Sequence, residues 1–394
     1  MQKLIEIKDL ITNFYTYEGV VKALNRISLD IDKGITFGLV GESGCGKSVT
    51  VRSIMRIVQP PGVIEGGQII FYGENKADGT QNPPIDLLLQ SDEEMRDLRG
   101  DQISMIFQEP NAALNPILSI GDQVSESFLF HKKKDMAGTI LKALNAKDNK
   151  TWPLINVYLK FTYSLLHQNP QSNFLKFLSR IPMLSLWEKR LEKEARRLSI
   201  EIMKKLAIPN PEKIFDSYPH NLSGGMKQRI VIAIALACSP ILLIADESTS
   251  NLDVTIQAQI LELLNTLKKN IISSILLITH DLGVVAETCD RVGVMYAGNI
   301  CEIADVKDLF HFPRHPYTSA LLDSVPKRAQ TGELETIEGN VPNLVTPPPG
   351  CRFHPRCRLT MDICRKVTPE LKDVGHNHLV ACYAVTPYES TGTI

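Results

Sequence analysis

The residues with the clearest chemistry form the segment GESGCGKS, from Gly41 to Ser48. This segment fits G-x-x-x-x-G-K-[ST], the spacing of loops that bind nucleotide phosphates. Its glycines allow backbone N–H groups to curl around the phosphates, and the helix expected next adds its positive end. Lys47 is expected to reach the β- and γ-phosphates, and the Ser48 hydroxyl to ligate Mg²⁺. The residues predicted to contact the nucleotide are Gly41, Ser43, Gly44, Cys45, Gly46, Lys47, Ser48 and Val49. Cys45 would contact it through its backbone alone.

Acidic and polar side chains follow three other segments that read as buried strands. ILLIADE ends in Asp246, expected in the outer shell of Mg²⁺, and in Glu247, a candidate base that polarises the attacking water. SILLITHD carries His280, and ISMIFQEP carries Gln108, whose amide would contact both Mg²⁺ and the water. We predict Glu247, His280 and Gln108 as catalytic residues, and Ser48, Gln108 and Asp246 as the magnesium site. The alternatives are two acids in an ordinary turn and a histidine with a structural role.

The hydrophobic pattern indicates the elements that position these residues. Before the loop, apolar and polar residues alternate with period two, which is typical of half-buried antiparallel strands. Residues 131–208 show helical spacing, and residues 230–300 alternate helices with short apolar strands. Strands that alternate with helices predict a parallel sheet with its ligands at the carboxyl edge. The sequence therefore predicts an α/β fold built around a phosphate-binding loop.

The segment NLSGGMKQR (221–229) places Ser223, Gly224 and Gly225 at the start of a predicted helix, whose first N–H groups would bind an anion. It resembles the signature sequence of ABC ATPases, and this resemblance extends over nearly all of residues 1–330. The resemblance implies a P-loop NTPase fold with a RecA-like core, an antiparallel β subdomain and a helical subdomain. It also implies that the anion is the γ-phosphate held by a second subunit, so that two chains sandwich two ATP molecules.

The same resemblance gives roles to three further positions. Asp253, in SNLD, would lie in the loop that crosses the subunit interface. Phe14 falls where the family stacks an aromatic ring on adenine; Tyr15 and Tyr17 lie close by, and a core aromatic is the other interpretation. Ser248 departs from the family, which has proline after the catalytic glutamate. Because proline fixes φ, serine leaves that turn looser.

The C-terminal part narrows the resemblance. HPYTSALLDSVP (315–326) and GNVPNLVTPPPGCRFHPRC (339–357) resemble the extension of oligopeptide/dipeptide importer ATPases, and the chain is most similar to the D-type subunit. This implies a heterodimer with an F-type ATPase, two permease subunits and, indirectly, a substrate-binding protein. The resemblance implies peptide as the solute, with oligosaccharide or nickel as related cargoes. It places the chain peripherally on the cytoplasmic face of the cell membrane.

Four of the eight cysteines crowd the last fifth of the chain. Their spacing is wider than that of the usual paired zinc ligands, so zinc, an iron–sulfur cluster and free thiols are all open on spacing alone. The nearby histidines His354, His376 and His378 would be further zinc ligands. The family resemblance favours a four-iron–four-sulfur (4Fe–4S) cluster with a structural role. The predicted cluster ligands are Cys351, Cys357, Cys364 and Cys382.

The predicted domains are an ABC nucleotide-binding domain over 1–300 and a C-terminal extension over 301–394. The helical subdomain is expected over about 110–228, with an extended insertion over about 138–190. Residues 131–200 hold 14 Lys and Arg against 5 Asp and Glu, as well as both tryptophans of the chain. The insertion is either a basic, aromatic element that lies on the membrane or permease, or a helical subdomain that buries its own aromatics.

Composition limits the remaining function classes. Lys and Arg number 43 and Asp and Glu 44, so the net charge of −1 gives no reason to expect nucleic acid as a partner. The longest apolar run, residues 230–245, contains a proline and is shorter than the roughly 20 residues of a spanning helix. Two rival functions are an ABC ATPase that acts on ribosomes or DNA and a redox-regulatory module centred on the cysteines.

Overall fold

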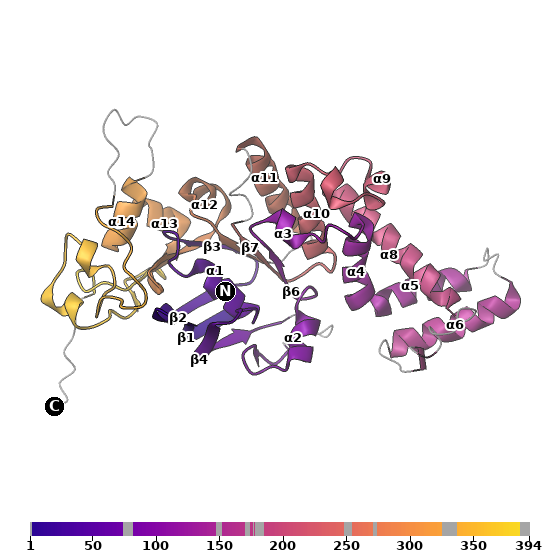
Figure 1. The fold of residues 1–394 in the computed structure, drawn as a ribbon, viewed down its shortest axis with the longest axis horizontal. Coiled ribbons are helices and arrows are strands. Elements are labelled where there is room, and N and C mark those ends of the chain that lie inside the picture. The colour runs from indigo at the N-terminus through magenta and orange to yellow at the C-terminus, as the bar shows by residue number, and fades with distance from the viewer. Residues whose placement is uncertain are drawn as a thin grey trace. The chain divides into compact units, whose positions relative to one another are not determined.

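The computed structural model describes residues 2–73, 82–146, 152–169, 174–175, 177, 185–247, 254–270, 274–324 and 337–386. The chain divides into two compact units. Unit 1 comprises residues 1–96, 241–250 and 264–394, and unit 2 comprises residues 97–240 and 251–263. Figure 1 labels most of the helices and several of the strands along the chain.

A large mixed sheet forms the centre of unit 1. Seven strands follow the order β11-β12-β10-β9-β3-β8-β7. β3 pairs in parallel with β8 and β9, and β7 pairs in parallel with β8. β10 pairs antiparallel with β9 and β12, and β11 pairs with β12. The bounds of these strands are β3 (Thr36–Val40), β7 (Leu242–Asp246), β8 (Ser274–Ile278), β9 (Arg291–Tyr296), β10 (Asn299–Asp305), β11 (Lys372–Asp373) and β12 (Leu379–Val380).

Burial explains why β3, β7, β8 and β9 read as apolar runs and not as alternating patterns. Every residue of these four strands is buried, as expected for parallel strands covered on both faces. The parallel pairs confirm the α/β fold predicted from the sequence. Helices of the same unit are α1 (Lys47–Ile54), α12 (Leu282–Thr288), α13 (Val306–His311) and α14 (Pro316–Asp323).

A second, antiparallel sheet in unit 1 has the order β2-β1-β4-β5. It confirms the antiparallel strands predicted from the period-two pattern. β1 and β2 shift register at four points, and Asp9 and Arg26, with φ angles of 47° and 52°, lie at two of them. The strands are β1 (Lys3–Thr16), β2 (Gly19–Asp32), β4 (Gly62–Phe71) and β5 (Ile85–Asp86).

Unit 2 is mostly helical, as the spacing over 131–208 predicts. α5 packs on α6, and both pack on α8. Two helices lie at the unit boundaries, namely α2 (Asp92–Leu98) and α11 (Val254–Asn270). The other elements are β6 (Ile103–Ile106), α3 (Pro110–Ala113), α4 (Ile120–His131), α5 (Lys133–Asn145), α6 (Pro153–Gln168), α8 (Leu186–Lys205), α9 (Pro211–Phe215) and α10 (Gly224–Leu236).

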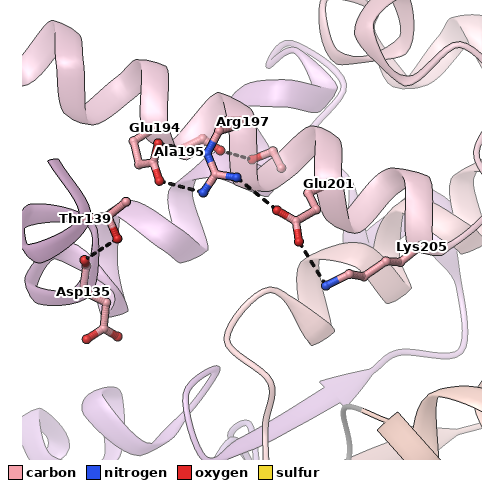
Figure 2. Close-up of polar contacts among 8 residues, drawn as sticks. Asp135, Thr139, Glu194, Ala195, Arg197, Glu201 and Lys205 are labelled. Carbon is pink, nitrogen blue, oxygen red and sulfur yellow. Dashed lines mark hydrogen bonds and ion pairs between the residues drawn. The ribbon is translucent and has the colours of Figure 1, made fainter. Parts of the chain in front are cut away.

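The outward faces of α8 and α6 differ in chemistry. On α8, Arg197 pairs with Glu194 at 2.8 Å and with Glu201 at 3.2 Å, and Lys205 pairs with Glu201 at 3.2 Å (Figure 2). Such pairs three or four residues apart are typical of a solvated helix surface. They stabilise it only slightly, because exposed ion pairs are screened by water.

On α6, by contrast, apolar side chains occupy two opposite faces. Leu159, Tyr163 and Leu166 are buried within the unit. Leu154, Val157 and Phe161, spaced three and four residues apart, are exposed by 77%, 68% and 58%. The helix therefore has features of both interpretations of the insertion. It buries one aromatic face within the subdomain, and it exposes another that a membrane-facing element would need. Within the same insertion, apolar residues recur at helical spacing in the sequence from Phe174 to Ile181, and this segment lies largely outside the described residues. None of the described helices is long and apolar enough to span a membrane.

The end of the chain packs on the rest of unit 1. Tyr296, Tyr317 and Phe353 stack at ring-centroid distances between 4.6 and 5.3 Å and belong to one buried apolar cluster. β12 adds to the sheet beside β10. Beneath this junction lies Glu302, which is fully buried and accepts bonds from the backbone N–H groups of Arg314 and His315.

Candidate functional site

The phosphate-binding loop joins β3 to α1, as its sequence predicts. Lys47 is the first residue of α1, and its side chain is only 4% exposed. Its ammonium group donates to the carbonyl oxygens of Gly41 at 2.8 Å and Glu42 at 3.1 Å. The amine thus lies inside the loop, where a phosphate oxygen would replace these carbonyls as its partner.

Two glycines of the loop are required by their surroundings. Gly41 has φ 151°, and a Cβ atom there would lie 2.0 Å from the carbonyl oxygen of Met295. Gly46, the N-cap of α1, has φ 109°, and a Cβ atom there would lie 2.9 Å from the carbonyl oxygen of Ala23. Both positions combine a left-handed backbone with close approach of another chain segment, so only glycine fits them. This packing holds the loop in shape.

Two of the three expected magnesium ligands, Ser48 and Asp246, meet at the carboxyl ends of β3 and β7. The Ser48 hydroxyl donates to Asp246 Oδ1 at 2.9 Å, which brings together two residues separated by 198 positions. Asp246 is 3% exposed, and burial raises the pKa of its carboxyl group. A hydroxyl and a carboxylate in contact form an oxygen site of the kind that Mg²⁺ prefers. The donors present therefore fit the metal.

Glu247 follows at the edge of the same sheet. It has φ 45°, a left-handed conformation that is uncommon outside glycine, and its N–H donates to the carbonyl of Ile278 at 3.0 Å. Its Oε1 lies 3.6 Å from Nδ1 of His280. Strained backbone is often found where a side chain must point in one direction. Together the two side chains could hold and polarise a water molecule. The Glu247 carboxylate would accept the proton of the water, and His280 would stabilise the transferred phosphoryl group.

Other predicted residues lie in unit 2 or outside the described residues. Gln108 follows β6 and is exposed in unit 2. Ser223 is the N-cap of α10, and its hydroxyl accepts from the N–H of Met226 at 3.4 Å. Gly224 and Gly225 open that helix. Asp253 and Ser248 lie outside the described residues. The contacts of Gln108 and the Ser223–Gly225 helix with nucleotide stay predictions.

The aromatic candidates for the adenine base lie at the end of β1. Phe14 is half-buried and faces Gly62 across the sheet, where a Cβ atom would lie 2.6 Å from the Phe14 ring. Tyr15 is 52% exposed and its hydroxyl bonds to Glu65, while Tyr17 is 98% exposed. Phe14 is therefore partly packed against its own sheet, and its contact with adenine stays a prediction.

The C-terminal extension contacts the phosphate-binding loop, which sequence reasoning missed. The Tyr317 hydroxyl accepts from the N–H of Glu42 at 3.0 Å, and Arg356 forms an ion pair with the Glu42 carboxylate. The N–H of Gly298 donates to the Cys45 carbonyl at 2.8 Å. The signal in the sequence was present in the segments HPYTSALLDSVP and CRFHPRC, which were recognised only by their resemblance to a family.

The cluster predicted at the four cysteines of the C-terminal extension stays a prediction. Across the residues that the structure describes, no three His, Cys, Asp or Glu side chains are grouped so that they would hold a metal ion. A zinc ion needs its sulfur ligands at about 2.3 Å, so they must lie close together. His378, an alternative zinc ligand, instead bonds to Glu302 at 2.6 Å. One narrow cavity is lined by all four cysteines, namely Cys351, Cys357, Cys364 and Cys382.

Comparison with known proteins identifies the family of this site. Residues 24–250 match the model of the ABC transporter family. The chain belongs to this family. Residues 301–364 match the C-terminal region of oligopeptide/dipeptide transporters. Membership makes the chain an ABC-type ATPase.

Curated relatives align over almost the whole chain. The dipeptide transport ATP-binding protein DppD of Bacillus subtilis (strain 168) is 42% identical over 385 residues, which cover 97% of this chain and 95% of the relative. The oligopeptide transport ATP-binding protein OppD of the same organism is 39% identical over 389 residues, covering 98% and 90%. These relatives confirm the predicted resemblance to peptide transporter ATPases.

Solved structures confirm the fold. The dimeric ATP-binding cassette MJ0796, in a post-hydrolysis state bound to ADP and Pi, superimposes with a TM-score of 0.52 at 20% identity and covers 77% of this chain and 99% of its own. The structure of cbiO1 from Clostridium perfringens, part of the ABC transporter complex cbiONQ, gives a TM-score of 0.50 at 23% identity, with coverage of 79% and 92%. The predicted ABC ATPase fold is therefore correct.

Proposed function

We propose that the chain is the ATP-hydrolysing subunit of an ABC importer that takes up oligopeptides or dipeptides, or a related solute such as an oligosaccharide or nickel. The observation that carries this proposal is the match of residues 301–364 to the C-terminal region of oligopeptide/dipeptide transporters, on a chain with the loop geometry described above. The names of the relatives DppD and OppD support the same solute class.

The mechanism follows from the chemistry of the loop. Lys47 would exchange its two carbonyl partners for the β- and γ-phosphates, and Ser48 with Asp246 would hold Mg²⁺. Bound Mg²⁺ supplies positive charge at the phosphate oxygens. Glu247 orients and polarises the attacking water, with His280 beside it and Gln108 completing the site. Closure over the phosphates excludes water and strengthens these interactions.

The proposed assembly is a dimer of ATPase subunits on two permeases. Ser223, Gly224 and Gly225 would bind the γ-phosphate of the companion F-type subunit, and Asp253 would lie at the interface. Phe14 would contact the adenine base. Oriented N–H groups at the start of α10 support the first of these roles, because a helix N-terminus attracts anions. A substrate-binding protein would deliver the solute, and no nucleic acid takes part.

We place the chain peripherally on the cytoplasmic face of the membrane. The exposed apolar face of α6 and the excess of basic residues over 131–200 support this position. An interfacial helix buries such a face among lipid headgroups, and basic residues are attracted to anionic lipids.

Substitution of the candidate base tests the proposed reaction. In complexes with the companion ATPase, Glu247→Gln should lower ATP hydrolysis by about 10²- to 10⁴-fold and accumulate an ATP-bound dimer in size-exclusion chromatography. Glu287→Gln, an exposed change on α12, should leave both measurements unchanged. A Glu247→Gln chain that cleaves ATP at the parental rate contradicts the mechanism.

We also propose a 4Fe–4S cluster at Cys351, Cys357, Cys364 and Cys382, with a structural role. All four line one narrow cavity, which supports their action as ligands of one shared group. Anaerobically purified protein should show broad absorbance near 400 nm and carry about four iron atoms per chain. Protein with stoichiometric zinc and no such absorbance contradicts the cluster.

A further inference from the structure

A cavity outside the ATP site opens in unit 1 between the β1–β2 sheet, the turn from β9 to β10 and the C-terminal extension. Its volume is about 550 Å³, which is within the roughly 300–1,000 Å³ of small-molecule sites. None of the loop residues from Gly41 to Ser48 lines it. About half of its wall is polar and includes charged side chains, so its ligand would be recognised by charge and hydrogen bonding.

At the base of this cavity lies Arg352, whose charge has no carboxylate partner. The residue is 4% exposed, and Nη1 donates to the carbonyl oxygens of Lys22, at 3.1 Å, and Ala297. Nε and Nη2 make no hydrogen bond to any described residue, and no described carboxylate pairs with the guanidinium. Burial lowers the pKa of Arg352 to about 10, so it stays protonated at neutral pH. A buried cation without an anion is costly, and an anionic ligand would relieve this cost.

The mouth of the cavity carries charges of both signs. Asp9, Arg26 and Glu370 line it, all three are exposed, and none forms an ion pair with a described residue. Asp9 and Arg26 are left-handed residues at two of the register shifts between β1 and β2. Bulges redirect side chains and occur next to functional sites. Two carboxylates and one guanidinium give the mouth a net negative charge, opposite to that of the base.

We propose that this cavity binds a small zwitterion, such as a free amino acid or a short peptide, with its carboxylate toward Arg352 and its ammonium group toward Asp9 and Glu370. The opposed charges favour a ligand with one charge at each end. Charge-assisted hydrogen bonds at both ends give the selectivity. Asn25 and Asn299, which bond to each other at 2.9 Å on the wall, supply neutral amide groups for the middle of the ligand.

The cavity is connected to the phosphate-binding loop by short steps. Arg352 holds the carbonyl of Ala297, and the next residue, Gly298, donates to the carbonyl of Cys45 in the loop. A ligand that engages Arg352 is therefore connected to the loop through Ala297 and Gly298. The identity of the ligand as an imported peptide rests on the proposed function, whereas the binding site itself does not.

Calorimetry with the full-length chain and no ATP tests the proposal, with trialanine as the probe and alanine as a second arm. Trialanine should bind, while N-acetyl-trialanine and trialanine amide, each lacking one charge, should bind more than about tenfold more weakly. Binding of alanine as tight as that of trialanine would assign the site to amino acids within the same class. No heat from any of these probes up to about 10 mM would overturn the proposal.

Variants of exposed residues at the mouth test the site without disturbing the fold. The double change Asp9→Asn with Glu370→Gln should weaken trialanine binding more than about tenfold and leave the affinity for N-acetyl-trialanine unchanged. Glu18→Gln, in the turn of the same hairpin but outside the cavity, should have no effect. Unchanged binding in the double variant would overturn the proposal. ATP hydrolysis is measured separately: a chain that hydrolyses ATP without binding trialanine refutes this site alone, and the reverse result refutes the proposed function alone.

Discussion

Arg356 and Glu42 form a two-point ion pair, with Nη1–Oε2 at 2.8 Å and Nη2–Oε1 at 3.2 Å, across 314 positions of the chain. Glu42 is the second residue of the phosphate-binding loop, and Arg356 belongs to the cysteine-rich extension. The guanidinium also donates to the carbonyls of Ile337 and Glu338 at 3.1 and 2.9 Å. The extension thus fixes one end of the loop that we predict to hold ATP.

Removal of this ion pair should affect both stability and nucleotide binding. Arg356→Gln leaves a partly buried carboxylate without its partner and should lower the free energy of unfolding by about 1–3 kcal/mol. The KM for ATP should rise, because Glu42 loses its anchor. Denaturant titration and steady-state kinetics measure the two effects. Arg358→Gln, an exposed arginine two residues away, is the control. Equal stability of the two variants would contradict a role for the pair.

Asp246→Asn should have opposite effects on metal binding and on the stability of the metal-free protein. Because burial raises the pKa of Asp246, its charge costs stability that grows as pH rises from the unfolded value of 3.8 through the raised folded value. Without Mg²⁺, the asparagine variant should therefore be more stable than the parent at pH 7 and equal to it near pH 3.5. With ATP present, Mg²⁺ should stabilise only the parent. Thermal unfolding with and without Mg²⁺ measures this, and a variant less stable at pH 7 contradicts it.

Stability in mild acid should depend on His315. Burial lowers the pKa of this histidine from 6.5 to about 4, and Nδ1 accepts from the N–H of Tyr317. The unfolded chain then binds the proton more readily, so stability is complete above pH 6.5 and falls by up to about 3 kcal/mol on the way to pH 4. Chemical denaturation at several pH values should show a flatter profile in His315→Asn. The exposed His311→Asn should keep the parental slope, and identical slopes in both variants would refute the assignment.

The apolar face of α6 should determine lipid binding. Replacement of Leu154, Val157 and Phe161 by serine should reduce co-sedimentation with vesicles containing anionic lipid by at least about fivefold, because most of the buried apolar area is lost. Neutral vesicles should bind the parent more weakly. Leu89→Ser, at an 80% exposed position in unit 1, is the control. Parental binding by the triple variant would mean that this face serves another purpose.

Local sequence patterns were enough to predict the catalytic loop. Gly41 to Ser48 are consecutive, and Asp246 and His280 each end an apolar run, so their place at one sheet edge follows from the parallel topology. The spacing of apolar residues likewise predicted the antiparallel sheet and the helices of unit 2.

Other features were not predictable from the sequence because no local pattern encodes them. The partners Arg356 and Glu42 are far apart in the chain, and nothing in the spacing of either residue points to the other. The pairing of His378 with Glu302 removes a candidate zinc ligand, and only the fold brings these two residues together. On α6, periodicity identified apolar residues, but packing decides that Leu159 is buried and Leu154 exposed.

The antiparallel pairing of β12 with β10 has a practical consequence for any shortened version of the protein. A chain cut before residue 372 would uncover the backbone of β10 and leave the Glu302 carboxylate without its histidine. Uncovered strand edges recruit other chains, so such a fragment is expected to aggregate instead of behaving as a smaller ATPase. The last stretch of the polypeptide is thus needed for solubility as well as for the shape of the nucleotide site.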